Sequence, residues 1–80
     1  MMPRVKVLLP QWGMGMSEGT ITGWLKAVGD QVSEEEPLAT AEAEKVEDEI
    51  LAPAGGRLAE ILVEPGETIP VRTPVAIIEI

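Results

Sequence analysis

The middle of the chain carries the stretch that decides the fold, Thr40-Ala41-Glu42-Ala43-Glu44-Lys45-Val46-Glu47-Asp48-Glu49-Ile50. It contains neither glycine nor proline, so two β-strands can run through it with a tight reversal between them. We expect the reversal within residues 43–46, which predicts that Lys45 lies at an exposed hairpin tip. The turn lacks Gly, Asn and Asp, although a type I′ turn needs a positive φ angle at both central residues. A locally unfavourable residue choice often marks a functional site.

An internal repeat surrounds this stretch. When the chain is compared with itself at an offset of 37 positions, glycines, prolines and aliphatic residues match in register. The matched pairs are Gly19 and Gly56, Ile21 and Leu58, Leu25 and Leu62, Gly29 and Gly66, Asp30 and Glu67, Val32 and Ile69, Pro37 and Pro74, Leu38 and Val75, Ala39 and Ala76, and Glu42 and Glu79. The repeat predicts two halves with the same backbone, related by a pseudo-two-fold axis. Neither half is large enough for its own core, so we expect the halves to pack face to face.

Short β-strands are predicted along the rest of the chain. The sequence has 8 glycines and 7 prolines in 80 residues, which leaves little room for a helix of ordinary length. We expect strands near residues 4–9, 19–26, 38–43, 46–51, 57–63 and 74–80, with short bridging strands near 31–33 and 68–70. Regularly spaced short strands are typical of an all-β sandwich or barrel. A chain of this length forms a single domain, which we place at residues 1–80.

The composition disfavours several classes of function. The formal net charge is −8, so nucleic acids and anionic membrane surfaces are poor partners, whereas proteins with basic patches are good ones. Cys is absent, which excludes disulfides, and His is absent, which removes the commonest general base and metal ligand. No apolar run approaches membrane-spanning length, and the first one is too short for a signal peptide. We therefore expect a soluble, cytoplasmic protein.

Side chains that could carry catalysis or bind a metal are scarce. Ser17 and Ser33 have no His or Cys to activate them. The acidic runs 34–36 and 47–49 are typical of solvated faces, and the glycine-rich segment 13–19 lacks the lysine of a phosphate-binding loop. The pattern of a calcium-binding loop is also missing. We therefore expect neither enzyme activity nor a metal site.

Lysine is the remaining reactive side chain, and it occurs at positions 6, 26 and 45. Lys6 and Lys26 fall in or at the ends of predicted strands, and we interpret them as ordinary surface charges. Lys45 differs because the repeat and the predicted hairpin both place it at the apex. An exposed lysine in a turn is commonplace, so it is the position of Lys45 that favours a functional role.

A family resemblance extends over essentially the whole chain. The residues that carry it are Pro10-Gln11-Trp12-Gly13-Met14-Gly15-Met16-Ser17-Glu18-Gly19-Thr20-Ile21, Trp24-Leu25, Gly29-Asp30-Gln31-Val32, Pro37-Leu38, Glu42-Ala43-Glu44-Lys45-Val46, Ala52-Pro53-Ala54-Gly55-Gly56 and Pro65-Gly66-Glu67-Thr68-Ile69. Together they closely resemble the lipoyl domain of dihydrolipoamide acyltransferases, the core subunits of 2-oxo acid dehydrogenase complexes. The resemblance implies a flattened barrel of two four-stranded antiparallel sheets. It also implies lipoate in amide linkage to Lys45.

The turn around Lys45 departs in detail from the family's usual Glu-Thr-Asp-Lys-Ala pattern. Glu42 matches the acid three residues before the lysine, whereas Ala43 replaces a hydroxyl residue and Glu44 replaces the shorter Asp. The resemblance implies that Glu42, Glu44 and Val46 take part in recognition by the lipoylating enzyme. Related biotinyl domains have Met on both sides of their lysine, so biotin is the less favoured group here. The alternatives are a biotinyl carrier domain of a carboxylase and an unmodified β-sandwich that only binds partners.

The resemblance further implies a swinging-arm carrier that is not itself an enzyme. A thiamine-diphosphate-dependent dehydrogenase would reductively acylate the dithiolane on Lys45, in a complex acting on a 2-oxo acid or an acetoin-type substrate. An acyltransferase catalytic domain would pass the acyl group to coenzyme A, and dihydrolipoamide dehydrogenase would reoxidise the dithiol. We expect the isolated domain to be monomeric.

The family fold brings the loop 11–17 near the lysine, so the resemblance implies a docking surface made of this loop and the hairpin. Its candidate contact residues are Gln11, Trp12, Gly13 and Met14. Trp12 is equally compatible with a residue that caps the core, because Trp is seldom fully buried yet is enriched in interfaces.

Two further features concern turns and charge. The family often has Gly in the turn before Pro-Leu, where this chain has Glu35 and, 37 residues later, Arg72. If these turns need a positive φ, each non-glycine residue costs about 1 kcal/mol. The segment 42–49 holds five acids and one base, a net charge of −4. Carboxylates favour the unreactive ammonium form of a lysine, so we expect these acids to steer basic partner surfaces and not to activate Lys45.

Overall fold

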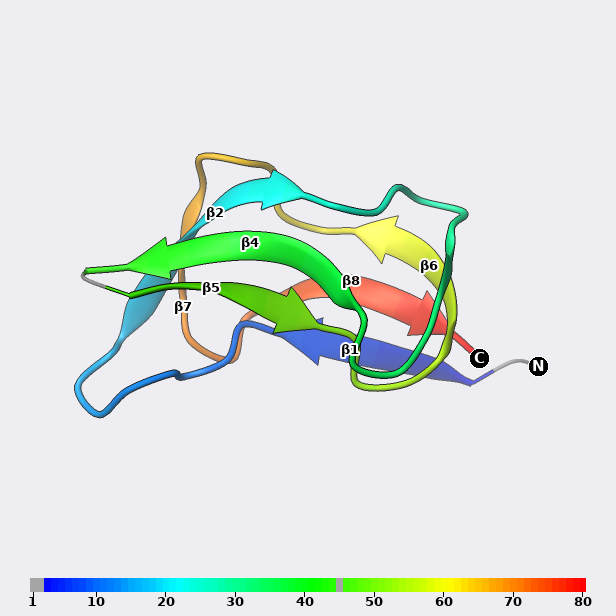
Figure 1. Ribbon diagram of the computed structural model, residues 1–80, viewed down its shortest axis with the longest axis horizontal. Coiled ribbons are helices and arrows are strands. Elements are labelled where there is room, and N and C mark those ends of the chain that lie inside the picture. Colours follow the sequence, from blue (N-terminus) through cyan, green and yellow to red (C-terminus); the bar gives the residue numbers. More distant parts are fainter. Residues whose placement is uncertain (1–2, 45) are drawn as a thin grey trace.

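The computed structural model describes residues 3–44 and 46–80, and every regular element in that part of the chain is a β-strand. The strands are β1 (Arg4–Leu8), β2 (Glu18–Trp24), β3 (Gln31–Val32), β4 (Pro37–Ala43), β5 (Val46–Leu51), β6 (Gly56–Ile61), β7 (Thr68–Pro70) and β8 (Pro74–Glu79). They pair antiparallel in two four-stranded sheets, with the orders β1-β8-β6-β3 and β5-β4-β2-β7 (Figure 1). The predicted strands and the predicted all-β fold of two four-stranded sheets are therefore confirmed.

The two halves of the repeat interlock by exchanging a short strand. β2 of the first half pairs with β4 of the same half and, on its other side, with β7 of the second half. In the same way, β6 of the second half pairs with β8 of the same half and with β3 of the first half. Each sheet thus contains strands from both halves, whereas the sequence predicted only that the halves pack face to face. The exchange joins the halves by backbone hydrogen bonds as well as by side-chain packing.

The repeat offset of 37 residues extends to single hydrogen bonds. The N–H of Gly29 donates to the carbonyl of Leu58 at 2.7 Å, and the N–H of Gly66 donates to the carbonyl of Ile21 at 2.7 Å. The irregularity in β2 after Ile21 recurs in β6 after Leu58. The predicted pseudo-two-fold relation between the halves is therefore observed in the backbone.

An aliphatic core lies between the sheets. Its largest fully buried side chains are Leu9, Ile21, Leu38, Ile50, Leu58, Ile78, Val7 and Val75. Trp24 is half-buried against this core, and its indole N–H donates to the carbonyl of Val63 at 2.9 Å. Within the described part of the chain no polar or charged side chain is buried, so the core carries no desolvated charge.

The β4–β5 hairpin forms one end of an elongated molecule whose longest dimension is 38 Å (Figure 1). The start of β1 and the end of β8 lie together at the opposite end of the molecule (Figure 1). There the N–H of Ile80 donates to the carbonyl of Pro3 at 2.9 Å. A segment attached to either end of the chain would therefore leave the molecule far from the hairpin.

An ion pair ties the end of β2 to the turn before β4. The ammonium of Lys26 lies 2.7 Å from the carboxylate of Glu36, which also accepts the N–H of Ser33 at 2.8 Å. The hydrogen bond from Lys26 lowers the pKa of Glu36, and the same contact raises the pKa of Lys26. Lys26, interpreted from the sequence as an ordinary surface charge, is thus paired with Glu36 in the structure.

The turns before β4 and β8 have a backbone conformation that favours glycine. The φ angle is 69° at Glu35 and 68° at Arg72. A backbone hydrogen bond joins the first and fourth residues of each turn, at 3.0 Å in residues 33–36 and 3.3 Å in residues 70–73. A positive φ at the third residue is the arrangement of a type II turn. Glu35 and Arg72 therefore stand at positions with a positive φ, where a residue other than glycine carries strain.

Relief of this strain is testable by glycine substitution. We predict that Glu35→Gly and Arg72→Gly each stabilise the domain by about 0.5–1 kcal/mol, because the strain removed exceeds the added flexibility of the unfolded chain. Urea unfolding measures the change in the free energy of unfolding. Glu34→Gly is the control, because Glu34 precedes Glu35 in the same turn but has no positive φ. This variant should destabilise the domain. A loss of stability in all three variants would contradict the prediction.

The glycine pair Gly19 and Gly56 gives a second, matched test. A Cβ atom at Gly56 would lie 2.5 Å from the carbonyl oxygen of Glu79, whereas one at Gly19 would lie 3.4 Å from that of Glu42. We predict that Gly56→Ala destabilises the domain by about 1–3 kcal/mol, because the backbone must shift. Gly19→Ala should have a smaller effect. Thermal melting of both variants compares them, and equal losses would show that the close approach at Gly56 is unimportant.

Candidate functional site

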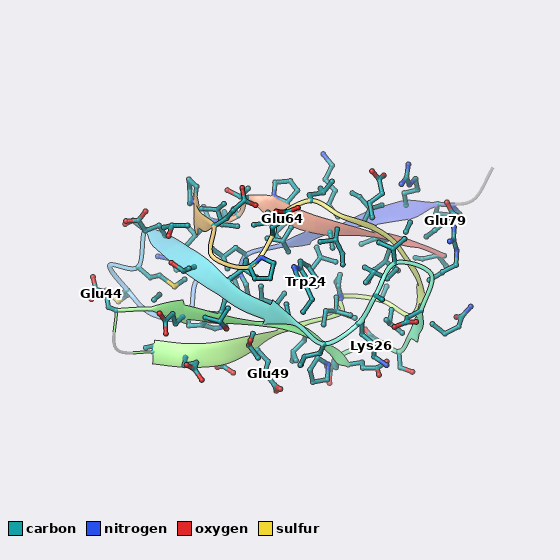
Figure 2. All side chains as sticks on the ribbon, turned by 90° about the horizontal axis from the view of Figure 1, so that it is seen from above. Trp24, Lys26, Glu44, Glu49, Glu64 and Glu79 are labelled. Atoms are coloured by element: carbon teal, nitrogen blue, oxygen red, sulfur yellow. The ribbon has the colours of Figure 1, made fainter. Side chains whose placement is uncertain are left out.

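The site predicted at Lys45 falls on a residue outside the described part of the chain, but the structure describes its neighbours. Ala43, the last residue of β4, pairs with Val46, the first residue of β5. Glu44 has a φ of 52°, the left-handed conformation that a two-residue hairpin turn requires at its first position. Glu44 and Val46 are exposed. Figure 2 shows Glu44 at the end of the molecule opposite Glu79, which lies near the chain ends.

Acidic side chains cover the hairpin. We define its acidic cluster as the exposed residues Glu42, Glu44, Glu47, Asp48 and Glu49. Glu42 lies directly opposite Glu47 in the β4–β5 register. Like charges in directly opposite positions destabilise a sheet. The hairpin therefore keeps a repulsive pair that its fold does not require.

The loop between β1 and β2 folds back on itself beside the hairpin. The N–H of Met16 donates to the carbonyl of Gly13 at 3.2 Å, and the N–H of Trp12 donates to the Sδ of Met16 at 3.4 Å. The side-chain amide of Gln11 donates to the carbonyl of Met16 at 3.2 Å. Trp12 and Met16 are half-buried against the core, whereas Met14 between them in sequence is fully exposed. The loop is therefore fixed on both sides of an exposed methionine.

A groove of about 410 Å³ lies between this loop and the hairpin. It is lined by residues 12–18 and by Thr20, Ala43, Glu44 and Val46. Side chains alternate along a strand, so Ala43 lies on the same face of β4 as the buried Ala41. Val46 lies opposite Ala43 and shares that face. The groove therefore continues the core face of the sheet beyond the point where the core ends.

The structure brings together most of the residues predicted for the site. Trp12, Gly13 and Met14 from the loop line the same groove as Glu44 and Val46 from the hairpin. Trp12 combines both roles considered for it, because it packs against the core and also lines the groove.

Two of the predicted residues do not line the groove. Gln11 supports the loop through its hydrogen bond to Met16, and Glu42 belongs to the acidic cluster. Sequence reasoning missed Glu18, Thr20 and Ala43, which do line the groove. Thr20 and Ala43 come to the site through the pairing of β2 with β4, whose register includes an irregularity. No pattern in the sequence reveals that register.

The described residues include neither a metal centre nor a membrane-spanning helix. Within residues 3–44 and 46–80, no group of three or more Asp or Glu side chains could hold a metal ion. The same residues include no helix long and apolar enough to cross a membrane.

Known proteins share both the sequence pattern and the fold. The biotin/lipoyl family model, described as "Biotin-requiring enzyme", matches residues 5–78. The chain is 44% identical over 70 residues to the dihydrolipoyllysine-residue acetyltransferase component of the pyruvate dehydrogenase complex of Corynebacterium glutamicum, a match that covers 88% of this chain and 10% of that protein. It is 43% identical over 74 residues to the corresponding component of the acetoin cleaving system of Bacillus subtilis, covering 92% of this chain and 19% of that protein.

A solved structure matches the whole domain. It is the solution structure of the lipoyl domain of the 2-oxoglutarate dehydrogenase complex from Azotobacter vinelandii, with a TM-score of 0.73, 28% sequence identity and 95% coverage of both chains. The chain thus spans 10–19% of the two acetyltransferase components but nearly the whole of an isolated lipoyl domain. From the matching family model, the identity to these relatives and the shared fold, we conclude that the chain belongs to the biotin/lipoyl attachment family and is a lipoyl domain.

Proposed function

We propose that this domain holds lipoate in amide linkage on Lys45 and moves acyl groups and electrons between the active sites of a 2-oxo acid or acetoin-type dehydrogenase complex. One observation carries the proposal. Glu44 and Val46, the sequence neighbours of Lys45, are exposed in the β4–β5 hairpin, which lies at the end of the molecule opposite the start of β1 and the end of β8 (Figure 1). A domain tethered through its ends would therefore present this hairpin to its partners.

The residues around the attachment position fit lipoate. The lining of the groove beside Glu44 and Val46 includes apolar side chains, among them Trp12 and Met14, which suit a saturated chain and a sulfur-containing ring. Glu44 and Val46 stand where biotinyl domains have Met, which supports lipoate over biotin. When bound, lipoate supplies a dithiolane that is reduced as it accepts an acyl group and is later reoxidised.

The protein's own contribution is tethering and recognition. A tether raises the concentration of the carried group at each partner active site without any new contact. The acidic cluster attracts basic partner surfaces and speeds encounter. The proposed partners are a lipoylating enzyme, a thiamine-diphosphate-dependent dehydrogenase, an acyltransferase catalytic domain and dihydrolipoamide dehydrogenase. The names of the acetyltransferase relatives support this assignment.

The attachment position is tested by intact mass and peptide mapping after expression with a lipoylating enzyme. We predict one lipoyl group per chain, on Lys45, and none in the variant Lys45→Gln. The free energy of unfolding of the variant should lie within about 0.5 kcal/mol of that of the unmodified domain, as is usual for surface substitutions outside special structural features. Lys6→Gln is the control, because Lys6 is exposed on β1, and it should remain fully modified. Lipoate on Lys6 or Lys26 would overturn the assignment.

The role of the acidic cluster is tested by neutralising two of its members. We predict that Glu44→Gln with Glu47→Gln slows lipoylation or reductive acylation at low salt and weakens the salt dependence of the rate. Stability should not fall, and removing the repulsion between Glu42 and Glu47 should add about 0.2–1 kcal/mol.

A matched control separates this local effect from the change in net charge. Glu34→Gln with Glu64→Gln removes the same two charges at exposed positions outside the hairpin. The rates of this control should follow those of the unmutated domain. Equal rates for all three proteins at low salt would mean that the acidic cluster is only a solvated face.

A further inference from the structure

We propose that the side of the molecule formed by β5 and β1 is a latent interface for a second copy of this chain, and that Asp48 keeps this interface closed. In the latent dimer, β5 of each copy pairs antiparallel with β1 of the other copy, about a two-fold axis. Only described residues of these two strands take part, and the interface is separate from the proposed carrier function.

Among the described strands, β1, β3, β5 and β7 lie at the edges of the two sheets. A strand at an edge has unpaired N–H and C=O groups to which another chain can bind. β3 has two residues and β7 has three, the last of which is Pro70, so both edges are short. β5 has six residues and β1 has five, and neither strand contains a proline. β5 and β1 are therefore the edges along which a second molecule could pair.

The positions of β5 and β1 allow a closed dimer. The two strands belong to different sheets, lie along the same side of the molecule and run in opposite directions (Figure 1). A two-fold axis parallel to the strands keeps the strand directions and exchanges the two layers. Such an axis places β5 of each copy antiparallel to β1 of the other copy. Both edges of each copy are then used, so the assembly closes at two molecules.

The outer faces of the two strands carry opposite charges. Side chains alternate along a strand, so Glu47 and Glu49 face outward from β5. Arg4 and Lys6 face outward from β1 in the same way. Arg4 is paired with Glu60, whereas none of the described carboxylates forms an ion pair with Lys6. Opposite charges on neighbouring strands stabilise their pairing, so the outer faces suit a dimer.

The core-side faces match less well, because of Asp48. Val5 and Val7 lie on the core side of β1. On β5, Ile50 is buried on that side, and Asp48 shares its face. Asp48 lies opposite the fully buried Ala41 and is nevertheless exposed, because β5 is an edge strand. A second copy would enclose this carboxylate beside aliphatic side chains, and burial of an unpaired charge is costly.

Asp48 also occupies a backbone donor of the edge. The N–H of Glu49 donates to the carboxylate of Asp48 at 2.7 Å. An incoming strand would have to displace the carboxylate before it could accept this N–H. Asp48 therefore opposes pairing through its charge and through its hydrogen bond.

A closed edge keeps the neighbouring groove accessible. Val46, the first residue of β5, also lines the groove beside the β1–β2 loop. A second molecule paired along β5 would extend to this residue. Asp48 thus keeps the domain monomeric, as expected from the sequence, and leaves the hairpin open to other partners.

The test measures self-association of the unmodified chain by analytical ultracentrifugation. We expect Asp48→Val to dimerise with a dissociation constant at least about tenfold lower than that of the unmutated chain, because the symmetric interface holds two copies of the unpaired carboxylate. Glu47→Val is the matched control, since it places the same side chain on the outer face of the same strand, and it should not promote association. Equal association of the two variants would indicate nonspecific adhesion and overturn the proposal, as would an Asp48→Val chain that associates no more than the unmutated one.

A second pair of variants identifies the strand to which β5 binds. In the Asp48→Val chain, the further change Lys6→Glu should weaken association by about tenfold or more, because it places like charges on the paired strands. Arg72→Glu makes the same change in charge at an exposed position outside β1 and β5, and it should leave association unchanged. A dimer that is insensitive to Lys6→Glu, or assemblies larger than a dimer, would contradict the two-fold pairing of β5 with β1.

Amide hydrogen exchange locates the interface on the backbone. In Asp48→Val the N–H of Glu49 loses its carboxylate acceptor and gains one on the second copy, so its exchange should slow as the chain concentration rises. Exchange at Glu49 that is independent of concentration in a dimer would overturn the assignment of the edge. Thermal melting checks that each variant is folded. Asp48→Asn, which removes the charge with little change in shape, gives the same comparison if Asp48→Val does not fold.

Discussion

Two backbone hydrogen bonds between the halves of the repeat determine the placement of everything else. The N–H of Gly29 donates to Leu58, and the N–H of Gly66 donates to Ile21, so a loop of each half is bound to a strand of the other. A slip of one residue in either half would turn its core side chains toward solvent. Burial of the core side chains therefore fixes the register of both sheets, and these two bonds form in that register. Because the register is fixed, so is the position at which β4 ends and β5 begins, and with it the hairpin.

The unfavourable features of the hairpin lie outside the part of the fold that these bonds stabilise. Glu44 adopts a positive φ, and Glu42 faces Glu47 across the strand pair. Each feature lies beyond Ala41, the last buried residue of β4 before the turn. The core can therefore be fully apolar while the hairpin keeps a sequence that suits recognition. Glu35 and Arg72 are different, because nothing in the structure explains why these residues stand in turns that favour glycine.

Much of the fold could be predicted from the sequence, because glycine and proline residues mark the ends of the strands and the internal repeat shows that the two halves have the same backbone. The positions of β3 and β7 follow from that pattern. The positive φ at Glu35 and Arg72 was stated only as a condition, suggested by the glycine that the family often has in these turns. The exchange of β3 and β7 between the halves could not be predicted, since it depends on long-range pairing. The groove was missed for the same reason. Its loop residues 12–17 stand out in the sequence, but Thr20 and Ala43 join them only through the register of β2 and β4. Lys45 was singled out by its position in the repeat and by family resemblance, and its placement lies outside the described residues.

The closeness of the two chain ends has a consequence for how such a unit can be combined with others. Ile80 is hydrogen-bonded to Pro3, and the hairpin lies at the far end of the molecule. Domains whose ends lie close together tolerate insertion into a host loop and circular permutation. Several copies could be strung in series, or one could be spliced into an unrelated scaffold, and every copy would still point its hairpin away from the connecting chain. The domain can thus be joined to many other domains, and the distance over which its hairpin can move is set by the length and stiffness of the linkers.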